Sequence, residues 1–174
     1  EQFQSDLKHK IQCFEERCEM GATIMYAREL NHKEFGVFYG LLLKCMAEKG
    51  YVDKEFDREM LNIEAKRVFS AVDQAVIGLF AQDKLIGFAI MMFEQQAFNN
   101  DKFVRMDICY IHPEYRDLDS LAHFFETIYD IAKQNDCYEI MVSKNNLTLN
   151  DAEANEFFAH DGYFKNDTIW KANI

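Results

Sequence analysis

The sequence predicts an α/β protein of the α+β type, in which a central mixed β-sheet is flanked by helices on both faces. Two apolar runs on either side of the polar residues 82–84 are typical of an antiparallel hairpin. Farther along, an apolar run, a long amphipathic segment and another apolar run indicate strands joined by a helix. A chain that contains both arrangements requires a sheet of mixed direction.

Residues 4–18 are predicted to form an amphipathic helix appended to the N-terminus. Apolar side chains recur there at the spacing that places them on one helix face, at Leu7, Ile11, Phe14 and Cys18. We therefore assign residues 1–20 to an N-terminal helical extension and residues 21–174 to a single domain. With 49% hydrophobic residues, a chain of 174 residues can bury one substantial core.

A short strand over residues 23–28 and two helices are expected next. Asn31 and Glu34 form a capping-box pattern at the start of the first helix, and Gly50 fits its C-cap. The second helix is expected over residues 53–70. Its predicted inward positions are Phe56, Met60, Ile63 and Val68.

Strands and helices alternate in the rest of the chain. We expect strands over 75–81, 85–93, 103–111 and 138–142, helices over 118–135 and 151–160, and one or two strands within 163–172. The helix over 118–135 has the clearest pattern, with apolar residues at helical spacing: Leu121, Phe124, Phe125, Ile128, Tyr129 and Ala132.

Composition excludes several classes of function. A net charge of −11 without a basic stripe argues against nucleic-acid binding. The apolar run at residues 85–93 is far shorter than the ~20 residues of a membrane-spanning helix, so no membrane role is expected. The cysteines lack disulfide or zinc spacing, which indicates free thiols in a reducing cytoplasm. The histidines are scattered, and no metal site is predicted.

Three local motifs point to one family. The first is Leu85-Ile-Gly-Phe-Ala in the hairpin, the second is Tyr110-Ile-His-Pro-Glu-Tyr-Arg at the end of a strand, and the third is Phe157-Phe158 shortly before Gly162-Tyr163. In these motifs and in its element order, the chain resembles the GNAT superfamily of N-acetyltransferases from Thr23 to Ile174. The resemblance implies a GNAT-like sheet, acetyl-CoA as cofactor and acetyl transfer to an unknown amine.

The resemblance also implies where the cofactor would bind. The matching positions lie at the strand end, in the following loop and in a later helix: Cys109, Ile111, Arg116, Asp117, Leu118, Asp119, Ser120, Leu121 and Phe158. Asp119 and Leu121 stand where the family has phosphate-binding glycines, so this loop is expected to be degenerate, with carboxylates and side chains in the space of the pyrophosphate. Alternatively, Asp117 and Asp119 only cap the helix. Phe158 replaces the tyrosine that serves the family as a general acid.

Three residues are candidates for the general base or for positioning water: Asp107, Tyr110 and Glu94. Each has a structural alternative, since Glu94 can be a solvated strand end, Tyr110 a core residue and Asp107 the partner of Arg105. Backbone N–H groups near Cys109 would polarise a thioester carbonyl. In a regular strand, Cys109 and His112 point to opposite faces, which does not favour a Cys–His pair.

Two hypotheses for the function follow. The first is a divergent, acetyl-CoA-dependent N-acetyltransferase. The second is a catalytically inactive GNAT-like module, for example one encoded by a bacteriophage, that acts through protein contacts made by its N-terminal helix and acidic surface. The partner is accordingly an unknown amine or a protein, and the oligomeric state stays open. Under both hypotheses the protein is expected in the cytoplasm. If a bacteriophage encodes it, the expected location is the host cytoplasm or the virion.

Overall fold

The computed structural model describes residues 24–51, 57–98, 100–143, 151–160, 164–166 and 169–173. Within these residues, seven strands form one sheet in the order β1-β2-β3-β4-β5-β7-β6. The helix expected over residues 4–18 lies outside the described residues, and so does the boundary proposed between residues 20 and 21. None of the described helices is long and apolar enough to cross a membrane.

The strands and helices occur in the predicted order. The strands are β1 (Met25–Glu29), β2 (Gln74–Ala81), β3 (Lys84–Gln95), β4 (Lys102–Ile111), β5 (Cys137–Ser143), β6 (Phe164–Asn166) and β7 (Ile169–Asn173). The α-helices are α2 (Phe35–Glu48), α3 (Arg58–Ser70), α4 (Leu118–Gln134) and α5 (Asp151–His160), and short 3-10 helices are η1 (His32–Glu34) and η2 (Pro113–Tyr115). Among the described strands, neighbours pair antiparallel except β4 and β5, which are parallel.

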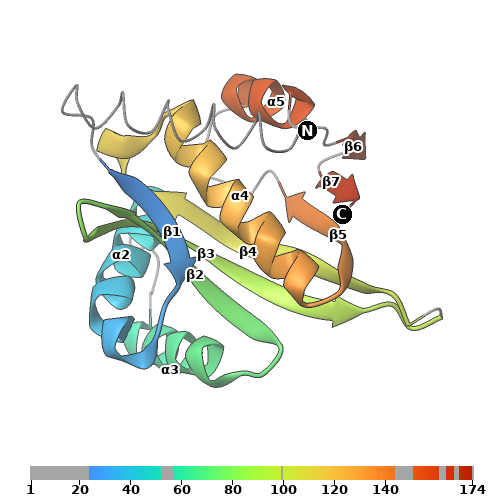
Figure 1. Cartoon of the computed structure of the whole chain (residues 1–174). Coiled ribbons are helices and arrows are strands. Elements are labelled where there is room, and N and C mark those ends of the chain that lie inside the picture. Colours follow the sequence, from blue (N-terminus) through green and yellow to red (C-terminus); the bar gives the residue numbers. More distant parts are fainter. Residues whose placement is uncertain are drawn as a thin grey trace.

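Helices cover both faces of this mixed sheet, which confirms the predicted fold class. Figure 1 shows α4 across one face and α2 with α3 on the other. Side chains of β2 alternate between two cores: Ile77 and Leu79 belong to the core under α4, whereas Val76 and Phe80 belong to the core under α2. Every residue of β2 is buried, as expected of a strand with helices on both sides.

The predicted capping box is present at the start of η1, the 3-10 helix that leads directly into α2. The Asn31 side chain accepts a hydrogen bond from the Lys33 N–H (3.0 Å), and Glu34 accepts one from the Asn31 N–H (2.9 Å). The helix ends where expected, because Gly50 has a φ of 73°, which is the left-handed conformation typical of a helix C-terminus. Between these caps, the apolar face of α2 packs on the sheet through Phe38.

The inward face predicted for α3 is wrong at two positions. Residues 53–56 lie outside the description, and the helix begins at Arg58 with Asp57 as its N-cap. Met60 and Ile63 are 52% and 50% exposed. The buried stripe is instead centred on Ala65, with Leu61, Val68 and Phe69 packed beside it. The sequence carries two apolar stripes, and the small Ala65 side chain permits the closer approach of α3 to β2.

Gly40 lies inside α2 on its exposed side, which leads to a stability prediction. A Cβ added there would meet no atom of the described residues within 4 Å. Because alanine is the better helix former, we expect Gly40→Ala to raise the free energy of unfolding by about 1 kcal/mol in urea denaturation. Gly50→Ala is the matched control and should lower it, since alanine is strained at a φ of 73°. A loss of stability in Gly40→Ala would contradict this account of α2.

Candidate active site

The pairing between the parallel strands β4 and β5 ends before β4 does. Their pairing runs from Lys102 and Cys137 to Met106 and Val142, and β4 then continues to Ile111. In the described residues, no strand pairs with this last part of β4 on its β5 side. A strand edge of this kind presents backbone N–H and C=O groups to which an extended chain can add.

A β-bulge in β4 directly follows the last residue that pairs with β5. Met91 pairs with Met106 and Ile90 pairs with Ile108, so Asp107 is an extra residue in β4. In a regular strand, two residues an odd number of positions apart face opposite sides of the sheet. Because of the bulge, Met106 and Cys109 have this spacing and still both pack in the core under α4. Tyr110 therefore faces the core under α2.

The backbone N–H and C=O groups of β4 point alternately toward β3 and toward the opposite, β5 side of the strand. The His112 N–H donates to the Ile86 carbonyl oxygen on β3 (2.8 Å). The Ile111 carbonyl consequently points away from β3, and there it accepts a hydrogen bond from Nε of Arg116 (2.7 Å). Because the N–H and C=O groups of every second residue point to the same side of a strand, the N–H of Cys109, like the carbonyl of Ile111, points to the β5 side of β4.

The turn after β4 leads directly into the N-terminus of α4. Pro113–Tyr115 forms η2, and Asp117 is the helix N-cap. The Asp117 carboxylate accepts a hydrogen bond from the Ser120 N–H (2.7 Å), and Asp119 lies in the first helical turn. A carboxylate of the protein thus occupies one of the N–H groups that a helix N-terminus could offer to an anionic ligand.

Most of the side chains proposed for cofactor binding lie in the core. Ser120, Leu121 and Phe158 are at most 1% exposed, and Cys109 and Ile111 are also buried. The structure differs here from the expectation that the Leu121 side chain occupies the space of a pyrophosphate, because leucine at this position packs under α4. Around the helix start, the exposed side chains are those of Asp117, Leu118 and Asp119.

Arg116 is held by a contact that sequence reasoning missed. Its guanidinium makes a bidentate ion pair with Glu48 at the end of α2, with N–O distances of 2.6 and 2.7 Å. The same guanidinium lies 5.5 Å from the centre of the Tyr110 ring. One signal was available, since a carboxylate in the last turn of a helix opposes the helix dipole and requires a cation.

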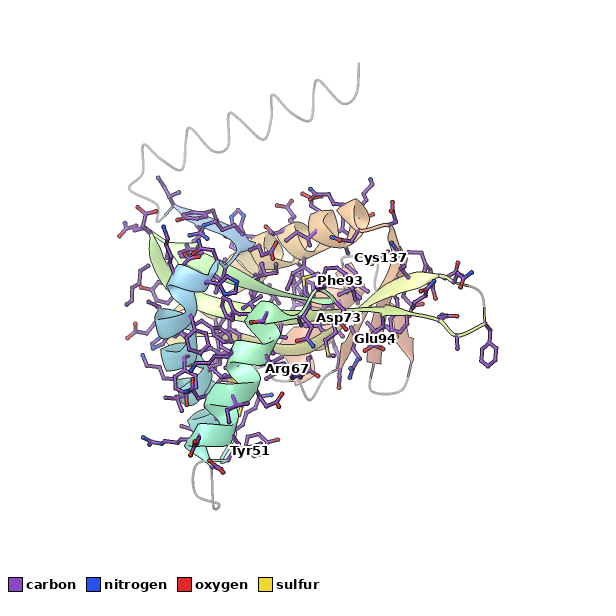
Figure 2. The ribbon with its side chains drawn as sticks, turned by 90° about the horizontal axis from the view of Figure 1, so that it is seen from below. Tyr51, Arg67, Asp73, Phe93, Glu94 and Cys137 are labelled. Carbon is purple, nitrogen blue, oxygen red and sulfur yellow. The ribbon has the colours of Figure 1, made fainter. Side chains whose placement is uncertain are left out.

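The three candidate catalytic residues fall into two groups. Glu94, labelled in Figure 2, and Asp107 share Arg105, with N–O distances of 2.6 and 3.8 Å. Glu94 is thus an ion-pair partner instead of a solvated strand end. Tyr110 is in the core under α2 and 1% exposed. Burial, then the Glu48 carboxylate, raises the Tyr110 pKa, so the phenol stays protonated.

The buried cysteines do not have the properties of nucleophiles. Burial raises the pKa of Cys109 to about 12 and that of Cys45 to about 11. Cys109 packs under α4, whereas His112 lines a pocket on the α2 side, so the two side chains lie on opposite faces. The described residues contain no group of three His, Cys, Asp or Glu side chains that could hold a metal ion.

Comparison with solved structures identifies the fold as that of GNAT acetyltransferases. A GNAT family acetyltransferase from Staphylococcus aureus has a TM-score of 0.58 at 20% identity, covering 72% of this chain and 93% of that one. A "predicted acetyltransferase with acetyl-CoA" from Clostridium acetobutylicum has a TM-score of 0.64 at 12% identity, covering 83% and 92%. The PaiA N-acetyltransferase from Thermoplasma acidophilum, in complex with coenzyme A, has a TM-score of 0.60 at 16% identity, covering 87% and 99%.

Comparisons by sequence gave a different result, because neither the models of protein families nor the curated proteins contained a match. The likeness therefore lies in the arrangement of strands and helices. It establishes that this chain has the GNAT fold.

Proposed function

We propose that the protein is an acyl-CoA-dependent N-acetyltransferase. The observation that carries this proposal is the edge of β4 at Cys109, which lies beyond the last pair of β4 with β5 and shortly before the N-terminus of α4. An extended arm with amide groups can pair with such an edge as an added strand. Support for acetyl-CoA as the ligand comes from fold relatives solved with acetyl-CoA and with coenzyme A.

The residues at this edge suit the cofactor in part. The N–H of Cys109 points to the β5 side of β4 and can pair with an arm that carries amide groups. The N-terminus of α4 would place the positive end of the helix dipole near the diphosphate of the cofactor. Asp117 and Asp119 act in the opposite sense, because like charges repel a diphosphate. We therefore expect binding through the strand edge, weakened at the helix N-terminus by the degenerate loop.

Acetyl transfer requires that an amine attack a thioester carbonyl, and bound acetyl-CoA would supply the activated acetyl group. We assign the Cys109 N–H to the carbonyl oxygen, on which negative charge develops. Tyr110 is buried in the core under α2 with a raised pKa, so we assign it a packing role and no proton transfer. Asp107 and Glu94 are the candidate groups for accepting the proton of the amine or for positioning water, with Arg105 holding both.

The acceptor in this proposal is a cationic amine. At a net charge of −11, the protein attracts protonated amines over long range and repels polyanions. Such an amine has to lose a proton before it attacks, and the carboxylates near β4 fit that requirement.

The alternative is a GNAT-fold module that binds partners without coenzyme A. One observation favours it: both groups best placed to hold a phosphate, the Arg116 guanidinium and the Ser120 N–H, are engaged by carboxylates of the protein itself. In this case the N-terminal helix predicted for residues 1–20 and the acidic surface would make the contacts.

Titration with acetyl-CoA in a calorimeter separates the two functions. Binding near micromolar Kd, ~8 kcal/mol, supports the enzyme, whereas no heat at about 1 mM ligand would leave the binding module. Asp117→Ser keeps a helix cap and removes the charge, so we expect acetyl-CoA affinity to rise about fivefold at low salt.

The matched control is Asp57→Ser. Asp57 caps α3 in the same way, accepting hydrogen bonds from the N–H groups of Glu59 (2.9 Å) and Met60 (3.0 Å). Its replacement should leave acetyl-CoA affinity unchanged. Equal changes in the two variants would show that the charge at α4 has no local effect on the ligand.

A further inference from the structure

A pocket lies beside α2 at one end of the sheet. It has a volume of about 330 Å³ and lies between α2, the start of β3 and the residues that follow β4. We call it the α2 pocket and define it by Gly36, Gly40 and Lys44 of α2, Lys84 of β3, and His112. The volume is within the range of small-molecule sites.

Two glycines of α2 leave this space open. Gly36 and Gly40 are one helical turn apart and both line the pocket. A Cβ at either position would meet no atom within 4 Å in the described residues, so packing does not require glycine there. Glycine inside a helix is destabilising relative to alanine, and here the fold gains no contact in return.

The rest of the lining combines an apolar wall with positive charge. Val37, Leu41 and Leu85 supply the apolar side chains, whereas Ile86 also lines the pocket but belongs to the core under α4. Lys44 and Lys84 supply the charge, and the structure gives neither an ion pair with a described carboxylate. The Lys84 ammonium lies 6.0 Å from the centre of the Tyr115 ring, which also lines the pocket.

His112 adds a polar atom without a partner. Its Nδ1 is buried and has no hydrogen-bond partner among the described residues. The nearest carboxylate oxygen, on the 73% exposed Glu114, is 3.8 Å away, which is too long for a hydrogen bond. Buried polar atoms normally have a partner, and a polar group of a ligand would provide one.

We propose that the α2 pocket binds a small organic anion with a short apolar body, such as an aliphatic or aryl acid. The apolar body contacts Val37 and Leu41 in the space that the glycines leave, and the acidic group lies near Lys44, Lys84 and His112. This site is separate from the edge of β4 proposed for acetyl-CoA. His112 and Tyr115 belong to the turn that leads into α4, so the ligand also contacts that turn.

The test is an NMR titration of the full chain with phenylacetate, without coenzyme A. We expect amide shifts centred on His112 and Gly40, and weaker binding of the neutral phenylacetamide. Phenyl phosphate, in a parallel titration, distinguishes a phosphate ligand from a carboxylate ligand. The double substitution Lys44→Met and Lys84→Met should raise the Kd of phenylacetate about fivefold, whereas Lys66→Met on α3 should not change it.

Filling the pocket provides the second arm of the test. Gly40→Leu places a side chain in the open space and should raise the Kd at least about tenfold. Ala47→Leu adds the same side chain at an exposed position of α2 outside the pocket lining and serves as the control for folding. The proposal is overturned by absent binding at about 10 mM phenylacetate, by equal affinity for phenylacetamide, or by an unchanged Kd in Gly40→Leu.

Discussion

Replacing Phe38 by alanine is expected to lower the free energy of unfolding by about 4 kcal/mol. Phe38 is fully buried, and its ring lies 5.0 Å from the rings of both Phe69 and Phe88, measured between centroids. It therefore joins α2, α3 and β3 in the core under α2. Truncation leaves a cavity that three separate elements would have to close, and urea denaturation followed by circular dichroism measures the loss.

The neighbouring residue supplies the control. Val37 is 58% exposed, so Val37→Ala should change the stability by less than about 0.5 kcal/mol. Since α2 also carries Glu48, loosening the helix should release Arg116 as well. Similar losses in the two variants would mean that α2 is not anchored through Phe38.

Gly87→Ala is expected to destabilise the protein by about 2 kcal/mol and to abolish acetyl-CoA binding. A Cβ at Gly87 would lie 2.8 Å from the carbonyl oxygen of Tyr110 and 3.4 Å from the Cα of Ile111. Both obstacles are backbone atoms of the β4 segment proposed to hold the cofactor. Relief of the clash requires β3 and β4 to separate at that point, which displaces the edge itself. Thermal unfolding and calorimetry together measure the two effects.

Gly78→Ala is the matched substitution on β2. The three atoms nearest to its Cβ would be side-chain atoms, Cδ2 and Cγ of Leu30 and Cδ1 of Leu85, which can move without displacing a strand backbone. We expect a smaller loss of stability and unchanged acetyl-CoA affinity. Full binding by Gly87→Ala would refute the location proposed for the cofactor.

Local patterns in the sequence sufficed for most of the fold. The helix predicted over 118–135 is α4, because its apolar residues have one unambiguous helical period and Asp117 caps its start. The hairpin turn was predicted equally well, and Gln82 and Asp83 have the positive φ angles (47° and 64°) of a tight two-residue turn. In α3, by contrast, two apolar stripes compete, and tertiary packing decides between them.

The contacts made by the residues of the candidate site could be predicted only in part from the sequence. Arg116 and its matching motif were found, but its partner Glu48 lies 68 positions away, and nothing local in the sequence joins the two. The burial of the Leu121 side chain follows from the direction in which α4 crosses the sheet. Pairing across the fold and the orientation of a helix are tertiary properties, so the identity of a residue in a loop motif does not determine what it contacts.

The additional residue in β4 makes the site sensitive to chain length. Shortening the strand by Asp107 would restore strict alternation after Met106. Cys109 and Ile111 would nevertheless keep their places in the core under α4 and Tyr110 its place in the core under α2, because the bulge already absorbs the extra residue. An insertion of one amino acid between Ile108 and Cys109 that no bulge absorbs would instead exchange these faces, and it would disrupt both cores and the proposed ligand edge at once.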